Sequence, residues 1–189
     1  MIVKLLIIHY NIKIMNLKSK IREIPDWPKD GINFKDITTL LLDPEAFREA
    51  VDSLAAPFSG QEIEKVLGID ARGFLLAAPV AYSLKTGLAI VRKKGKLPAK
   101  TIRREYTLEY ASNTIEMHED AVRPGEKVVL IDDLCATGGT ALAACDLIEE
   151  LGGKIVGVSF LVDLPFLGGS KKLKDRGFTV RSLINYESE

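Results

Sequence analysis

The chain has 189 residues, of which 47% are hydrophobic and 28% charged, and these proportions are typical of a globular protein with a substantial core. Its 26 basic side chains balance 26 acidic ones, so no overall field attracts nucleic acid or an acidic membrane. The two cysteines, Cys135 and Cys145, lack metal-ligand spacing, which argues against a disulfide framework or a zinc site. We therefore expect a reducing, cytoplasmic setting.

The N-terminus carries an apolar patch at residues 5–8 that is too short to span a membrane and has no small-residue cleavage site. We therefore expect no membrane association. The globular pattern begins near Ile21, so residues 1–20 are interpreted as an N-terminal extension and residues 21–189 as a single domain. The alternative is a strand or arm that packs on a partner subunit.

The first half of the chain predicts helices and strands in alternation. Residues 43–58 predict an amphipathic helix, because Asp43 can cap it and apolar residues recur at helical spacing. A buried strand is expected at 65–69 and another at 88–91. Between them, a helix is expected to be regular from Pro79 to Lys85 and to stop at Gly87.

The second half starts with seven basic residues among positions 92–104, and we expect a hairpin with a partly exposed strand at 114–117. An apolar stripe at 144–151 predicts a helix, and 155–162 a buried strand. This alternation indicates an α/β fold with a mostly parallel central sheet flanked by helices. Ligands of such sheets bind at the carboxyl ends of the strands.

The stretch VVLIDDLCATGGT, residues 128–140, places two acids after the four-residue apolar run Val128–Ile131. A run of this kind suits a central parallel strand, so Asp132 and Asp133 are expected at its carboxyl end. Since successive strand residues point to opposite sides, the two acids can hold different parts of one ligand, such as ribose hydroxyls or a metal-bound water. Simple solvation of both acids is the alternative.

The small residues that follow predict a loop whose backbone N–H groups approach an anion at a helix N-terminus. This expected anion loop consists of Ala136, Thr137, Gly138, Gly139 and Thr140. The glycine patterns of nucleotide-triphosphate and dinucleotide sites are both absent. The motif therefore favours one phosphate plus a diol, although a strand, a Gly-Gly turn and a helix also form ordinary architecture.

The thirteen-residue run resembles the phosphoribosyl-pyrophosphate motif of type I phosphoribosyltransferases, and residues 24–185 are similar to the adenine branch of that family. Four further segments carry the resemblance: DGINFKDIT (30–38), DARGF (70–74), RKKGKLP (92–98) and YTLEY (106–110). The resemblance implies the type I fold with a flexible hood loop and a small base-binding hood region. It also implies transfer of the phosphoribosyl group to adenine in purine salvage, with Mg²⁺, by a homodimer.

The same resemblance implies roles for individual residues. Arg72 is expected to act in catalysis and pyrophosphate binding, beside a cis peptide between Asp70 and Ala71, and Glu109 to handle the purine proton within a hood over 100–112. The resemblance also implies contacts of Tyr110 with the phosphoribosyl group and of Asn33, Phe34, Lys35 and Leu164 with adenine. Independently, the clustered cations of the basic run favour pyrophosphate binding by Arg92, Lys93 and Lys96. No direct Mg²⁺ ligand is expected, because the ion is held through pyrophosphate and ribose hydroxyls, with water bridges to Asp132 and Asp133.

Several alternatives remain open at this point. An enzyme of the same fold for another purine would need a polar reader for a 6-oxo group, and a regulator could keep the sugar site as a sensor without catalysis. Nucleic-acid binding is the alternative function of the basic run at 92–104, but this run is short and has few aromatic partners. Cys135 is interpreted as a small apolar filler rather than a nucleophile, because no histidine accompanies it.

Overall fold

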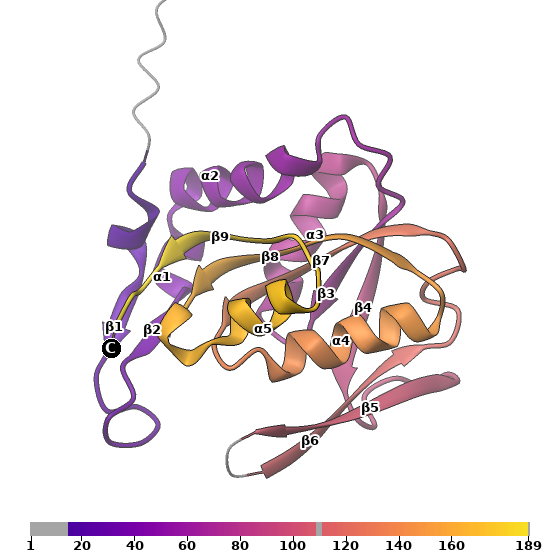
Figure 1. Cartoon of the computed structure of the whole chain (residues 1–189). Coiled ribbons are helices and arrows are strands. Elements are labelled where there is room, and N and C mark those ends of the chain that lie inside the picture. The colour runs from indigo at the N-terminus through magenta and orange to yellow at the C-terminus, as the bar shows by residue number, and fades with distance from the viewer. Residues whose placement is uncertain (1–14, 109–110, 189) are drawn as a thin grey trace, which may run out of the picture.

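A computed structural model describes residues 15–108 and 111–188, and a seven-stranded sheet forms its centre (Figure 1). The strand order is β5-β6-β4-β3-β7-β8-β9. Five neighbouring strands run parallel: β4 (Gly87–Lys93), β3 (Lys65–Ile69), β7 (Lys127–Cys135), β8 (Lys154–Asp163) and β9 (Val180–Asn185). The antiparallel hairpin of β5 (Thr101–Leu108) and β6 (Ala111–His118) adds to the β4 edge. The predicted mostly parallel sheet is confirmed.

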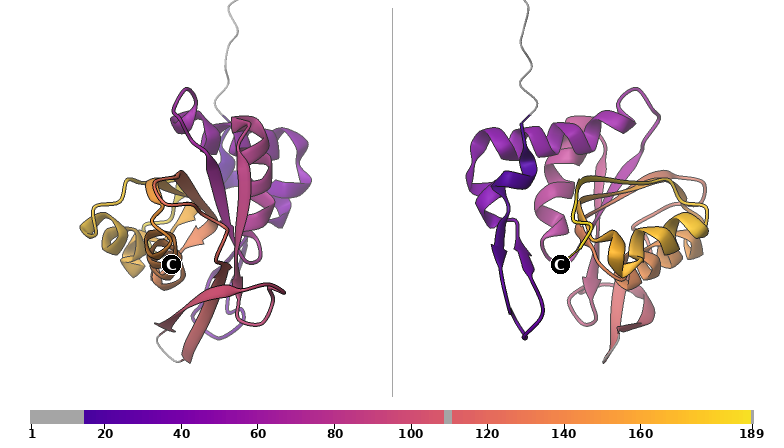
Figure 2. Two further views of the ribbon diagram at one scale, coloured as in Figure 1. Left: turned by 90° about the vertical axis from the view of Figure 1, so that its right-hand side faces the viewer. Right: turned by 60° about the vertical axis from the view of Figure 1, so that its left-hand side comes forward.

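Helices cover both faces of this sheet (Figure 2). The helices α1 (Thr38–Leu42), α2 (Pro44–Ala55) and α3 (Gly73–Leu84) share one core, and α4 (Gly139–Glu150) and α5 (Gly169–Asp175) share the other. Alternate residues of β7 enter opposite cores, Val129 and Ile131 in the first and Val128 and Leu130 in the second. This burial on both faces explains the continuous apolar run of the strand.

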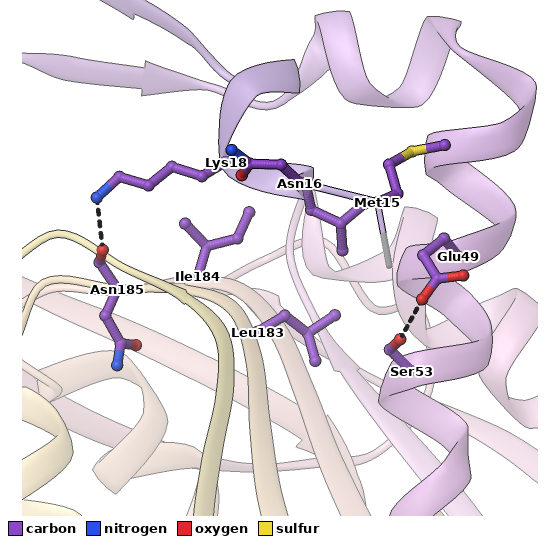
Figure 3. Close-up of a pocket in the computed structure, with 9 residues that line it drawn as sticks. Met15, Asn16, Lys18, Glu49, Ser53, Leu183, Ile184 and Asn185 are labelled. Carbon is purple, nitrogen blue, oxygen red and sulfur yellow. Dashed lines mark hydrogen bonds between the residues drawn. The ribbon is translucent and has the colours of Figure 1, made fainter. Parts of the chain in front are cut away.

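Short elements surround the sheet. They are the 3₁₀ turns η1 (Leu17–Lys20), η2 (Ala56–Phe58) and η3 (Pro165–Leu167) and the antiparallel strands β1 (Arg22–Ile24) and β2 (Phe34–Asp36). Leu17 packs in the core of α1–α3, and Lys18 donates to the carbonyl of Asn185 at 2.9 Å. Figure 3 shows this contact beside a cavity of about 470 Å³ between η1, α2 and β9. Residues 17–20, assigned to the extension from sequence, therefore contact the main core.

Two of the sequence expectations about elements are wrong, the bounds of α3 and the exposure of Glu116. Helix α3 begins at Gly73, six residues before Pro79, and its C-cap is Lys85 with φ +57° rather than Gly87. Strand β7 runs on to Cys135, past the predicted apolar run, and the acid pair lies near its carboxyl end as expected. The side chain of Glu116 on β6 is fully buried, although the alternation predicted an exposed position. The expected cis peptide between Asp70 and Ala71 is present.

Candidate active site

Three cavities adjoin one another at the carboxyl ends of β3 and β7. The first, of about 120 Å³, lies at the β7–α4 loop, the second, of about 330 Å³, lies over the acid pair, and the third, of about 350 Å³, lies between β2 and η3. Asp132 and Thr140 line both the first and the second, and Arg72 lines both the second and the third. One ligand with three chemically different parts can therefore extend through all of them.

The first cavity is formed by the predicted anion loop. Gly138 has φ +79°, which a residue with a side chain rarely adopts, and it turns the chain into α4. Within the described parts of the chain, no acceptor is found for the backbone N–H groups of residues 136–140. Unpartnered amides at a helix N-terminus form a binding site for an anion, as the sequence predicts.

The acid pair lies at the boundary of the first two cavities. Asp132 is 9% exposed and Asp133 6%, and Oδ1 of Asp132 accepts from the backbone N–H of Asp133 at 2.9 Å. Burial raises the pKa of Asp132 well above its usual range, and the adjacent charge of Asp133 adds to the rise. Burial also raises the pKa of Asp133, while the Arg72 guanidinium opposes it. Both carboxyls can accept from a diol, as expected.

The second cavity combines this pair with cationic and polar side chains. Nε of Arg72 lies 2.6 Å from Oδ2 of Asp133, and Lys93 lines the same cavity. Sequence reasoning missed Tyr106 and Asn113, which also line it; the Thr140 hydroxyl donates to the Tyr106 hydroxyl at 3.0 Å. Tyr106 opens the YTLEY segment, but its place at the acid pair, like that of Asn113 opposite it, depends on the hairpin, which brings both from a distant part of the chain.

The third cavity is apolar on its walls. Phe34 and Leu164, the predicted adenine clamp, both line it together with Phe166. Trp27 meets Phe34 edge to face at a centroid distance of 4.5 Å, which fixes the ring from the side. Flat heterocycles bind well in such an aromatic and aliphatic slot.

The other two predicted adenine residues point their side chains at Glu23 on β1. Nζ of Lys35 lies 2.5 Å from Oε2 of Glu23, and Nδ2 of Asn33 donates to the same oxygen at 2.7 Å. The Lys35 ammonium lowers the pKa of Glu23, and the Asn33 amide adds to this. Both residues also line the third cavity, and the Asn33 amide oxygen is buried without a partner in the described structure. Since both side-chain donors bind Glu23, this oxygen and the backbone of residues 33–35 remain as the parts that can read the edge of a base.

The three predicted pyrophosphate residues lie near one another, but only one of them lines a cavity of the site. Lys93 lines the second cavity, whereas Lys96 is exposed on the β4–β5 connection. Nε of Arg92 donates to Asp70 at 3.1 Å, and its Nη1 donates to the carbonyl of Lys96 at 3.2 Å. Arg92 therefore supports the connection and the strand end as well as adding charge.

Glu116 on β6 accepts hydrogen bonds from the same β4–β5 connection. Its Oε1 accepts from the backbone N–H groups of Lys96 at 3.0 Å and Leu97 at 3.1 Å, and its Oε2 accepts from Arg103 at 3.1 Å. Burial raises the pKa of Glu116, but these donors outweigh burial and leave the pKa below its usual value. Sequence analysis did not identify this residue.

Three remaining expectations concern Glu109, Tyr110 and Cys135. Glu109 and Tyr110 lie outside the described residues. Cys135 is 2% exposed, and burial, with the charges of Asp163 and Asp132, raises the pKa of its thiol to about 12. A thiol of this kind is not a nucleophile near neutral pH, which agrees with the interpretation as a filler.

Residues 15–108 and 111–188 contain no group of three or more His, Cys, Asp or Glu side chains that could hold a metal ion. No helix within these ranges is long and apolar enough to cross a membrane.

Comparison with known proteins identifies the family. Residues 38–186 match the model of the phosphoribosyl transferase domain. The chain is 54% identical over 171 residues to an adenine phosphoribosyltransferase of Methylorubrum extorquens, which covers 90% of this chain and 94% of that protein. This chain belongs to the adenine phosphoribosyltransferase family. The resemblance inferred from the five sequence segments is confirmed.

Solved structures support the same conclusion. A crystal structure of adenine phosphoribosyltransferase from Thermoanaerobacter pseudethanolicus matches with a TM-score of 0.87 and 48% identity, covering 92% of this chain and 99% of that one. The adenine phosphoribosyltransferase of Trypanosoma brucei, solved with AMP, pyrophosphate and ribose-5-phosphate, matches with a TM-score of 0.82 and 27% identity, covering 89% and 78%. The type I fold expected from sequence is thereby confirmed.

Proposed function

We propose that this chain transfers the 5-phosphoribosyl group of phosphoribosyl pyrophosphate to adenine, giving AMP and pyrophosphate in purine salvage. The observation that carries the proposal is the series of adjoining cavities: an amide loop for a phosphate, an acid pair for a diol, and an apolar slot for a flat base. In the reaction, N9 of adenine forms a bond to C1 of the sugar, the bond from C1 to the pyrophosphate oxygen breaks, and the proton of N9 leaves.

Base recognition is assigned to the third cavity. Phe34 and Leu164 enclose the two faces of adenine, and the backbone around Asn33 and Lys35 reads its amino edge. An apolar clamp supplies affinity, whereas fixed backbone donors and acceptors discriminate between an amino and an oxo group. Support comes from the donor groups of two side chains, Nδ2 of Asn33 and Nζ of Lys35, which donate to Glu23 instead of a 6-oxo group.

The phosphoribosyl group is assigned to the first two cavities. The N–H groups of residues 136–140 bind the monoester, and Asp132 and Asp133 accept from the ribose hydroxyls. Arg72 and Lys93 face the leaving pyrophosphate, whose charge increases as the bond to C1 breaks. Cations that stabilise this charge lower the barrier. Arg92 and Lys96 contribute at longer range, and Tyr110 contacts the sugar phosphate.

Magnesium is proposed as the cofactor, and the residues fit it only in part. Asp132 and Asp133 supply the oxygen ligands that Mg²⁺ prefers, but Asp70, the third acid of this cavity, pairs with Arg92, and the described residues contain no group of three such side chains that could hold a metal ion. Most ligands must therefore come from pyrophosphate, the diol and water, and water can link the ion to the acid pair. When bound, Mg²⁺ neutralises charge on the pyrophosphate and improves it as a leaving group.

Proton handling is proposed for Glu109, which lies outside the described residues. A carboxylate near the purine can accept the N9 proton as the new bond forms. The segment over 100–112 is proposed as a hood that excludes water from the activated sugar, since hydrolysis would otherwise compete.

A homodimer is proposed from the surface of α3. This helix contains no charged residue between Gly73 and Leu84, and its Leu75 and Tyr82 side chains are 49% and 88% exposed. Leu88 on β4 is also exposed, at 44%. An uncharged helix with large exposed apolar side chains is typical of an interface. A cytoplasmic location is also proposed, supported by two free buried thiols.

The deciding experiment is a chromatographic assay of nucleotide products. The purified chain with Mg²⁺ and phosphoribosyl pyrophosphate is offered adenine, hypoxanthine, guanine or xanthine. We expect AMP from adenine and little product from the other bases. Failure to form AMP would reject the proposal, and faster conversion of an oxo-purine would favour an enzyme for another purine.

A further inference from the structure

Two consecutive carbonyl groups of the anion loop are bound by helix α5. The backbone N–H of Gly169 donates to the carbonyl of Ala136 at 3.1 Å, and Nζ of Lys172 donates to the carbonyl of Thr137 at 3.2 Å. Helix α5 is anchored in turn, because its Ser170 and Leu173 side chains are buried. The loop is therefore supported from the side opposite its ligand.

These two bonds determine where the loop amides point. Both peptide units are trans, and in a trans unit the carbonyl and the next N–H point in opposite directions. With the carbonyls of Ala136 and Thr137 held by α5, the N–H groups of Thr137 and Gly138 point away from α5. Neither N–H has a described acceptor. The contacts with α5 thus hold the amides in the orientation that an anion requires.

The approach of α5 to the loop is too close for any side chain at position 169. A Cβ on Gly169 would lie 2.2 Å from the carbonyl oxygen of Ala136 and 2.5 Å from the nitrogen of Gly138. The sequence therefore permits this support only because residue 169 is glycine.

The loop also lacks a cation of its own. The described lining of the first cavity contains Asp132 and no lysine or arginine. Burial and the charges of Asp163 and Asp132 raise the pKa of the neighbouring Cys135 thiol, whereas the charge of Lys172 lowers this pKa. Lys172 therefore contributes positive charge at the loop. Without Lys172, a phosphate monoester placed there would meet amide dipoles, the hydroxyls of Thr137 and Thr140 and the charge of Asp132, but no cation from the described lining.

We propose that Lys172 is a positioning residue for the phosphate monoester. Its ammonium holds and polarises the Thr137–Gly138 peptide unit and offsets the nearby carboxylates. The inference rests on the proposed function in one respect, that the monoester binds at the anion loop.

The adjacent Lys171 provides a matched control. It pairs with Asp175 one turn along α5 at 2.6 Å, and its side chain is 77% exposed. Replacing Lys171 removes the same charge from the same short helix without touching the loop. Any difference between the two lysine variants therefore reports on the contact with Thr137.

The test is calorimetric titration of the full chain with ribose 5-phosphate and, separately, with pyrophosphate. For Lys172→Met we expect affinity for ribose 5-phosphate to fall about tenfold, as for loss of one charge-assisted hydrogen bond, and affinity for pyrophosphate to change less than about twofold. Lys171→Met should leave both affinities unchanged. Lys172→Arg should recover most of the loss, because it restores the charge and a donor.

Each other outcome overturns the proposal. Equal effects of Lys171→Met and Lys172→Met would reduce the role to general surface charge. An equal loss of affinity for both ligands in Lys172→Met, together with a lowered melting temperature, would indicate a merely structural role. If the unmodified chain does not bind ribose 5-phosphate, the proposed site does not exist. Because these titrations need no turnover, they remain decisive even if the product assay fails to detect AMP.

Discussion

The guanidinium of Arg72 connects the acid pair with the aromatic slot: its Nε lies 2.6 Å from Oδ2 of Asp133, and its central carbon lies 5.1 Å from the centroid of Phe34. One side chain thus contacts both the proposed sugar site and the proposed base site. Its planar fork suits this position, since it can stack on an aromatic ring and still donate to oxygen.

We therefore expect Arg72→Lys to lower the rate of AMP formation about a hundredfold, the scale found when one preorganised donor is removed from an active site. Lysine keeps the charge but loses the planar donor pair. Steady-state kinetics with both substrates measure the effect. Arg48→Lys is the control, because Arg48 is exposed on α2 and lines none of the three cavities. An Arg72→Lys enzyme as active as the control would contradict this role.

Sequence reasoning succeeded where structure follows from local pattern. It predicted β3 with its bounds and the Asp43 cap of α2, which accepts from the backbone N–H groups of Glu45 and Ala46. It failed at the start of α3, because a proline was expected to open the helix. Burial of Leu76, Ala77 and Val80 on the sheet outweighs the cost of Pro79 inside a helix, about 3 kcal/mol.

The residues missed at the site depend on contacts between distant segments. Glu116 alternates with the buried Ile115 and Met117, so the pattern predicts exposure. Its donors lie 13 to 20 residues earlier in the chain, and local pattern does not identify such partners. Lys172 was missed for the same reason, since its contact with Thr137 spans 35 residues.

Glu116→Ala should destabilise the fold by roughly 2 kcal/mol, because the N–H groups of Lys96 and Leu97 lose their acceptor. Urea unfolding at neutral pH measures the change. Glu116→Gln should lose less stability, since its amide oxygen can still accept from the N–H groups of the β4–β5 connection. Glu105→Ala, at an exposed position of β5, is the control. Equal midpoints for the alanine variants would show that the buried carboxylate is dispensable.

Cys135 and Cys145 should both resist thiol reagents in the folded protein at pH 8. Burial raises the pKa of each thiol to about 12, so the reactive thiolate is scarce. Ellman titration should detect no rapidly reacting thiol before denaturant is added and two afterwards. Cys135→Ala should keep AMP formation within about threefold, as a small change in packing predicts. Loss of turnover in a folded Cys135→Ala protein would reopen the nucleophile interpretation.

Tyr82→Glu should convert the proposed dimer into monomers. A charge on the uncharged face of α3 would have to be buried without a partner, which weakens association by several kcal/mol. Light scattering behind a sizing column gives the mass. Leu42→Glu introduces the same charge at another exposed apolar site, 82% exposed on α1, and should leave the mass unchanged. A monomeric unmodified chain would remove the proposal.

The ion pair of Arg22 with Asp36 should make stability depend on acid pH. The Arg22 guanidinium, with help from Thr38, lowers the pKa of Asp36 from 3.8 to about 2. Because the folded pKa lies below the unfolded one, the contribution is fully present above about pH 4 and is lost as the pH falls towards 2.

Arg22→Met should therefore lower the free energy of unfolding by about 1 kcal/mol at pH 6. This value is small because the Arg22 side chain is 57% exposed. Its loss relative to the unmodified chain should shrink as the pH falls from 4 to 2. Urea unfolding across this range gives both curves, and Arg48→Met, on α2 and away from Asp36, serves as the reference. A gap between the Arg22→Met and unmodified curves that stayed constant from pH 6 to pH 2 would mean that Arg22 stabilises the fold by packing instead of through the charge of Asp36.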